Sequence, residues 1–391
     1  MLASLALIML LGIFTHLVCQ KLKLPSLVGY LLLGIILGPS VLNLLDQSLI
    51  NISADLRQII LIIILSRAGL SLDLDALRKV GRPAILMSFV PASFEIIGTI
   101  VFAPKILGLP VIDAAILGTV LGAVSPAVVV PAMLKLIKEK RGVDKGIPPL
   151  ILAGASVDDI YCLVLFAAFL GLRQTGRFQA SALLEIPLSI VAGVFIGGMM
   201  GFVLGLVFEK VSLTTGQQLL LMLSVSMAFV SFDNVSRLPF SGILAVMTMA
   251  MLIYRQVPGQ AEHIARYYYQ LWSVGELFLF VLVGASVDVA FAFTAGWRAV
   301  WLVFLVLAVR MVGVWVSLLG TGFGWKEKLF CMIAYLPKAT VQAAIGSIPL
   351  SLGLASGEII LTLSVVAILI TAPLGAVGIE WSYERLLDKA E

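Results

Sequence analysis

The sequence predicts an all-α integral membrane protein with about 13 transmembrane helices. Of its 391 residues, 61% are hydrophobic and only 12% are charged, against about 25% charged in a typical soluble domain. Apolar runs of about 20 residues, each long enough to cross a ~30 Å hydrocarbon layer as a helix, recur along the whole chain. Short motifs within and at the ends of these runs occur twice in the same order, which predicts two related halves.

Short polar linkers separate the apolar runs, so we expect no soluble domain. The first run has no basic region before it and no small-residue cleavage site, which favours a true helix over a signal peptide. The expected spans are 1–18, 25–45, 56–72, 82–104, 110–136, 147–172, 183–208, 217–232, 238–255, 270–288, 294–318, 328–350 and 356–379.

Basic residues outside the spans fall mostly in the odd-numbered loops and in the C-terminal tail. Because basic loops are retained on the cytoplasmic side, we expect the N-terminus outside and the C-terminus in the cytoplasm. The two histidines lie far from other candidate ligands, and the three cysteines lie far apart. We therefore expect no resident metal centre, no cofactor and no disulfide framework. The net charge of +4 is not a sign of a nucleic-acid partner in such a chain.

Two pairs of short motifs recur in the same order. Leu24-Pro25 opens the second span and Leu238-Pro239 opens the ninth. Gly69-Leu-Ser-Leu-Asp73 closes the third span and Gly284-Ala-Ser-Val-Asp288 closes the tenth, at nearly the same spacing from the prolines. Matched features at constant spacing indicate an internal repeat.

Two charged residues are also counterparts in this repeat. Glu95 follows Asp73 at the same distance along the chain as Arg310 follows Asp288. Each lies deep in the next apolar span, where an unpaired charge is costly. We therefore expect Glu95 and Arg310 to meet as a buried ion pair, although each could instead face a water-filled cavity.

A further repeated motif helps to predict how the two halves are oriented in the membrane. The segments 123–132 and 334–343 share the pattern Ala-x-x-Pro-x-x-x-Val-x-Ala in spans five and twelve. All matched spans lie seven apart, and an odd offset reverses the direction of each matched helix. The chain is therefore expected to be an inverted repeat of six helices (1–182), a linker helix (183–208) and six helices (209–391).

Prolines interrupt both of these spans near mid-membrane. Pro126 and Pro131 lie in the first and Pro337 in the second. Proline removes an amide donor and clashes with the preceding turn, so we expect two broken helices that cross near the membrane centre. The ends of half-helices carry partial charges that need partners, and Lys338 is placed to neutralise the exposed carbonyl ends.

Two adjacent acids lie near the centre of the sixth span. Asp158 and Asp159 follow about twelve residues of helix, and each costs at least ~2.5 kcal/mol to insert. Adjacent side chains on a helix point about 100° apart, so one can face an ion cavity while the other faces a packed helix. We expect Asp159 to carry the ion and the proton, with Asp158 as its tuner or second ligand.

Desolvation and mutual repulsion disfavour two bare negative charges at this depth. A proton or a hard cation such as Na⁺ or Li⁺ could neutralise the pair, and Ser125, Ser156 and carbonyls freed near Pro126 could supply further oxygen ligands. The sequence thus favours exchange of Na⁺ for H⁺. A sodium-coupled symporter of organic anions and a cation channel are the alternatives, but few extra basic side chains and no filter-like segment are present.

Three segments resemble the sodium/proton antiporters of the monovalent cation:proton antiporter-2 class. They are Leu121-Gly-Ala-Val-Ser-Pro-Ala-Val-Val-Val-Pro131, Gly154-Ala-Ser-Val-Asp-Asp-Ile160 and Leu336-Pro-Lys-Ala-Thr-Val-Gln-Ala-Ala-Ile-Gly346. Within this class the chain is similar to bacterial relatives of a branch of animal sodium/hydrogen exchangers. The resemblance implies a transporter rather than an enzyme, located in the inner (plasma) membrane of a bacterium.

The resemblance also implies a homodimer that works by an elevator-like movement. A mobile core domain would comprise about 56–172 and 270–391, and a dimerisation domain about 1–55 and 183–269. In the family, the second acid of the pair is the principal carrier, and the resemblance places it at Asp159. The partners of such a transporter would be Na⁺ or Li⁺, protons, the lipid bilayer and a second copy of the chain.

Two positions depart from the family pattern. Many bacterial relatives carry a lysine where this chain has Arg310, and that lysine is often tied to electrogenic exchange. Relatives also often carry an acid where this chain has Thr340. The resemblance therefore leaves the stoichiometry of exchange open.

Overall fold

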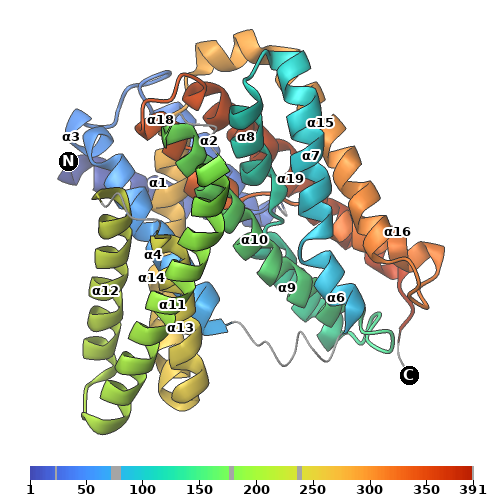
Figure 1. Ribbon diagram of the computed structural model, residues 1–391. Coiled ribbons are helices and arrows are strands. Elements are labelled where there is room, and N and C mark those ends of the chain that lie inside the picture. Colours follow the sequence, from blue (N-terminus) through green and yellow to red (C-terminus); the bar gives the residue numbers. More distant parts are fainter. Residues whose placement is uncertain (23, 72–80, 176–179, 236–239, 390–391) are drawn as a thin grey trace. The chain divides into compact units, whose positions relative to one another are not determined.

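The computed structural model describes the chain as a series of helices joined by short connections (Figure 1). Beyond these helices, the described residues contain one isolated antiparallel bridge, between Arg141 and Lys389. The predicted all-α class is confirmed for this part of the chain. The described residues are 1–22, 24–71, 81–175, 180–235 and 240–389, with the side chains of a few further positions left out.

Every expected span coincides with one to three helices. The helices are α1 (Leu2–Lys21), α2 (Ser26–Leu37), α3 (Gln47–Asn51), α4 (Ser53–Ser71), α6 (Arg82–Met87), α7 (Val90–Leu107), α8 (Val111–Gly122), α9 (Pro126–Lys138), α10 (Ile147–Thr175), α11 (Ala180–Lys210), α12 (Thr215–Val235), α13 (Gly242–Gln256), α14 (Pro258–Ala285), α15 (Val289–Ser317), α16 (Trp325–Ala334), α17 (Thr340–Ile345), α18 (Ile348–Ser351) and α19 (Gly357–Leu386).

The helices have the length and polarity of membrane spans. Among the described residues, nine helical stretches are long and apolar enough to cross a membrane, and α2 and α13 are apolar but shorter. This agrees with an integral membrane protein. The expected number of about 13 crossings stays a prediction.

The fifth span is broken as the sequence predicts. Helix α8 ends at Gly122, residues 123–125 are not helical, and α9 begins at Pro126, which lacks the amide that a continuing helix would need. The expectation of a second break at Pro131 is wrong, because Pro131 lies inside α9. Membrane helices tolerate an internal proline, as α7 does at Pro104.

The twelfth span is broken in the same way. Helix α16 ends at Ala334 and α17 begins at Thr340, with Pro337 in the non-helical segment between them. The two breaks touch, because the backbone N–H of Ser125 donates a 2.7 Å hydrogen bond to the carbonyl of Pro337. These contacts confirm the crossed broken helices of the predicted fold.

Two close helix contacts follow the predicted inverted repeat. A Cβ on Gly284 of α14 would lie 2.2 Å from the carbonyl oxygen of Leu31 of α2. In the matching contact, a Cβ on Gly69 of α4 would lie 2.5 Å from the carbonyl oxygen of Met247 of α13. The third and tenth spans thus each use the repeated glycine to pack against a span of the other half. The motif residues 72–73 and 238–239 lie outside the described residues.

The chain forms two compact units. One comprises Met1–Ala54, Leu74–Phe166 and Leu277–Glu391, and the other comprises Asp55–Asp73 and Ala167–Glu276. The predicted core and dimerisation domains divide the chain differently, since they separate the first 55 residues from the broken helices. Compactness alone does not show which part moves, so that division stays a prediction.

Candidate functional site

Five charged side chains surround the crossing of the two helix breaks in the first unit. Four of them, Glu95 of α7, Asp158 of α10, Arg310 of α15 and Lys338 of the second break, have fully buried side chains. Asp159 of α10 is half-buried. Burial of so many charges requires that they be paired or bound by ions.

Arg310 is bonded on several sides. Its Nη1 lies 3.1 Å from Oε2 of Glu95, and its Nη2 lies 2.8 Å from Oδ2 of Asp158. Its Nε donates a 3.2 Å hydrogen bond to the carbonyl of Tyr335, and Nη1 also donates to the carbonyl of Gly122. The predicted pair of Glu95 and Arg310 is confirmed, but the sequence did not predict that Arg310 also holds Asp158.

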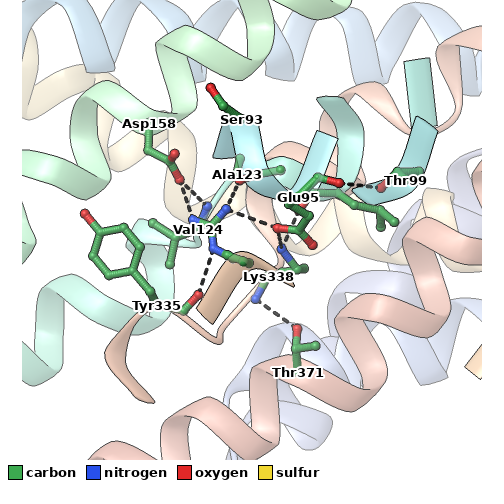
Figure 2. Close-up of polar contacts among 12 residues, drawn as sticks. Ser93, Glu95, Thr99, Ala123, Val124, Asp158, Tyr335, Lys338 and Thr371 are labelled. Atoms are coloured by element: carbon green, nitrogen blue, oxygen red, sulfur yellow. Dashed lines mark hydrogen bonds and ion pairs between the residues drawn. The ribbon is translucent and has the colours of Figure 1, made fainter. Parts of the chain in front are cut away.

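Lys338 completes the pairing of Glu95. Its Nζ lies 2.7 Å from Oε2 of Glu95 and donates a hydrogen bond to the carbonyl of Leu121, in the last turn of α8 (Figure 2). The last four carbonyls of a helix have no partner within the helix, and they carry a partial negative charge. Lys338 therefore neutralises an exposed helix end, as the sequence predicts.

Gln342 caps the same helix end. Its Nε2 donates hydrogen bonds of 3.0 Å to the carbonyl of Val120 and 2.9 Å to the carbonyl of Ala123. Sequence reasoning missed this residue. The available signal was its polarity, because an amide side chain inside an apolar span must find hydrogen-bond partners.

The two adjacent acids have different surroundings. Oδ2 of Asp158 accepts the bond from Arg310 and a 2.9 Å hydrogen bond from the backbone N–H of Val124 (Figure 2). Asp159 has no hydrogen bond or ion pair with any described residue, and its Oδ1 is buried. The predicted division of labour between the two acids stays a prediction.

Further oxygen atoms near the breaks have no hydrogen-bond partner among the described residues. Oδ1 of Asp158 and Oγ of Ser125 are both buried in this way. Ser125 is the N-cap residue of α9, but its hydroxyl does not cap the helix. The side chain of Ser156 lies outside the described residues.

The charges of this cluster do not cancel when all groups are ionised. It holds three carboxylates, on Glu95, Asp158 and Asp159, and two cationic groups, on Arg310 and Lys338. One net negative charge remains, and Asp159 is the acid without a cationic partner. One bound monovalent cation or one proton would neutralise the cluster.

The ring and the backbone carbonyl of Tyr335 both contact Arg310. The guanidinium carbon of Arg310 lies 5.5 Å from the centre of the Tyr335 ring, in addition to the bond to its carbonyl. A Cβ on Gly154 would lie 2.2 Å from the Tyr335 hydroxyl, so only glycine leaves room for the ring. Gly154 stands one helical turn before Asp158, which links the tyrosine to the acid pair.

Comparison with known sequences identifies relatives along nearly the whole chain. Residues 5–384 match the family described as sodium/hydrogen exchanger, transmembrane. Sodium/hydrogen exchanger 9B2 of Homo sapiens is 36% identical over 389 residues, which cover 94% of this chain and 71% of that protein. Sodium/hydrogen exchanger 9B1 of Homo sapiens is 33% identical, covering 83% of this chain and 65% of that protein.

A solved structure shows the same fold. The sodium proton antiporter MjNhaP1 from Methanocaldococcus jannaschii at pH 8 superimposes with a TM-score of 0.84 over 98% of both chains, at 19% sequence identity. This likeness concerns the fold alone. Together with the sequence match over residues 5–384, it shows that the chain belongs to the sodium/hydrogen exchanger family of membrane transporters.

Proposed function

We propose that this chain exchanges Na⁺ or Li⁺ for H⁺ across the membrane, with Asp159 as the carrier. The relatives named above are sodium/hydrogen exchangers, and the fold neighbour is a sodium proton antiporter. The observation that carries the proposal is the unpaired carboxylate of Asp159 in a cluster whose other acids are bonded to Arg310 or Lys338.

The site would bind a cation through oxygen atoms, which hard monovalent cations prefer. Asp159 supplies the principal ligand. Oδ1 of Asp158 and Oγ of Ser125 supply further ligands, and both atoms are free of hydrogen bonds to described residues. Ser156 and the carbonyls of the first break are the remaining candidates. In this proposal Na⁺ and H⁺ are cargo and not cofactors.

Exchange follows from the charge balance of the cluster. With a cation or a proton on Asp159 the cluster is neutral, but empty and ionised it carries a net negative charge. Moving a net charge through a low-dielectric barrier is costly, so the loaded site moves more easily than the empty one. Na⁺ and H⁺ therefore bind alternately to one carboxylate, and this alternation couples their opposite fluxes.

Alternating access would present this site to the two sides of the membrane in turn. We propose an elevator-like shift of the domain that holds the broken helices, in a homodimer with the N-termini outside the cell and the C-termini in the cytoplasm. The inner (plasma) membrane of a bacterium is the proposed location. Short linkers and rigid helix contacts favour a rigid-body movement over local rearrangement.

Flux through purified protein in liposomes tests the carrier. Asp159→Asn should abolish sodium-driven proton movement, whereas Asp158→Asn should weaken it or change its pH profile. Asp144→Asn, on an exposed loop acid, is the matched control and should behave like wild type. Normal exchange by Asp159→Asn would overturn the proposal, and sodium uptake that requires an organic anion would favour symport instead. Imposing a membrane voltage measures the stoichiometry in the same assay.

A further inference from the structure

One peptide group joins the two helix breaks to α19. The carbonyl of Pro337 accepts a 2.7 Å hydrogen bond from the backbone N–H of Ser125. The N–H on the other side of the same peptide, that of Lys338, donates a 3.0 Å hydrogen bond to Oγ1 of Thr371 on α19 (Figure 2). The peptide is therefore held at its oxygen by the first break and at its nitrogen by α19.

The Thr371 hydroxyl acts as the acceptor in this contact. It donates its own proton to the carbonyl of Ala367, one turn earlier in α19, over 2.8 Å. This bond within the helix holds the hydroxyl oxygen in place and leaves its lone pairs available to the N–H of Lys338. Thr371 and Lys338 are both fully buried, so bulk water does not compete for these bonds.

The same face of α19 is shaped to receive the second break. Gly375 follows Thr371 by one helical turn, and a Cβ at Gly375 would lie 2.3 Å from the ring of Pro337. Glycine lets the proline ring approach this closely because it has no side chain. Helix α19 therefore contacts the break twice, with a hydrogen bond at Lys338 and a close packing contact at Pro337.

Ser125 links this peptide to the candidate ion site. Its N–H is the group bonded to Pro337, and its hydroxyl is buried without a hydrogen-bond partner among the described residues. The preceding residue, Val124, donates its N–H to Oδ2 of Asp158 over 2.9 Å. A shift of the Pro337 carbonyl would therefore move a candidate ligand oxygen relative to the acid pair.

We propose that Thr371 is a positioning residue for cation binding, which acts through the peptide of Pro337 and Lys338 to hold the Ser125 hydroxyl at the ion site. This inference rests on the proposed function, in which that hydroxyl is a ligand of the transported cation. A hard cation needs several oxygen ligands, whereas a proton on Asp159 needs none beyond the carboxylate. Thr371 therefore supports the affinity for Na⁺ more than it supports the transfer of protons.

Thr371→Val tests this role, because it replaces the hydroxyl by a methyl group of similar size. The N–H of Lys338 then loses its acceptor, and the apparent KM for Na⁺ in liposomes should rise about fivefold, the equivalent of about 1 kcal/mol. The kcat should change much less, because Asp159 is intact. Thr371→Ser keeps the hydroxyl and should restore most of the affinity. Thr362→Val changes another buried threonine of α19 and is the matched control, with wild-type KM expected.

A double-variant cycle shows whether Thr371 acts through Ser125. Ser125→Ala should itself raise the KM for Na⁺, because it removes the hydroxyl but keeps the N–H that binds Pro337. Adding Thr371→Val should then raise the KM little further, since the oxygen to be positioned is gone. Two independent increases that multiply in the double variant would overturn this inference.

Stability measurements separate this role from a structural one. A lower melting temperature of Thr371→Val with wild-type KM would assign Thr371 a structural role only and would overturn the proposal. If Thr371→Val cannot be purified, Thr371→Ala removes the same acceptor and is judged by the same KM. Failure of the proposed function is recognised separately, because wild-type protein would then show no exchange, or Asp159→Asn would still exchange, in the same liposomes.

Discussion

Arg310 and Asp158 form a buried ion pair, with Nη2 of the arginine 2.8 Å from Oδ2 of the acid and both side chains inaccessible to solvent. The same guanidinium also binds Glu95, so one cation joins α15 to α10 and to α7. One oxygen of Asp158, Oδ2, therefore helps to hold the helices together. Its neighbour Asp159, at the next helix position, makes no hydrogen bond or ion pair with any described residue.

The pairing of Glu95 with Arg310 predicts non-additive losses of stability. Glu95→Ala and Arg310→Ala should each lower the free energy of unfolding by about 3–5 kcal/mol, because each leaves a buried charge without its partner. The double variant should lose less than the sum of the two. Unfolding of the detergent-solubilised protein measures all three. Arg298→Ala, at an exposed position of α15, should lose little, and additive losses would argue against the pairing.

The contact between Gly154 and Tyr335 predicts a rescue. Gly154→Ala should lower both stability and exchange, because the new methyl group would collide with the tyrosine hydroxyl and displace Arg310. Adding Tyr335→Phe removes the hydroxyl and should restore part of the loss. Gly171→Ala on the same helix meets open space and should be neutral or stabilising by up to ~1 kcal/mol. Equal behaviour of the two glycine variants would contradict this account.

An ion pair at the start of α16 predicts a pH-dependent contribution to stability. The carboxylate of Glu327 accepts hydrogen bonds from Lys145 and from the backbone N–H of Gly324. Burial opposes its ionisation, but these bonds outweigh burial and lower the pKa of Glu327 below its ordinary value. A lowered carboxyl pKa stabilises the fold above the ordinary value and loses that effect as pH falls through the lowered one.

Lys145→Ala should therefore lower the melting temperature at pH 7, and the difference from wild type should shrink in acid as Glu327 takes up its proton. Melting curves between neutral and acidic pH measure this difference. Lys326→Ala removes an exposed charge next to Glu327 and serves as the control. A gap that stays constant across the acid range would exclude Glu327 as the titrating group.

The parts of the fold that were predictable follow from local chemistry and from repetition. Pro126 and Pro337 lie where two helices are interrupted, because a proline lacks the amide that a continuing helix needs. Glu95 and Arg310 could be paired because the repeat gave them matching positions and because each would be costly alone in the membrane. Lys338 could be assigned to a helix end because the carbonyls exposed at a helix break carry a partial negative charge that needs a partner.

The parts that were missed depend on how the helices are rotated and packed. The sequence does not show that Arg310 reaches Asp158 as well as Glu95, since this needs α15 and α10 to present those faces to one another. It does not show that Gln342 caps α8, which is set by the height at which the breaks cross. Pro131 was misassigned because membrane helices tolerate proline, as α7 does at Pro104 and α19 at Pro373.

The hydrogen bond between Ser125 and Pro337 has a mechanical consequence. The first break supplies the donor and the second break supplies the acceptor. Sliding either break alone would leave this N–H and this carbonyl without a partner where water is scarce, at about 1–3 kcal/mol for each buried group. The two breaks are thus tied to each other at the points where the helices are interrupted. In the proposed mechanism, an ion bound beside this hydrogen bond would move together with both breaks.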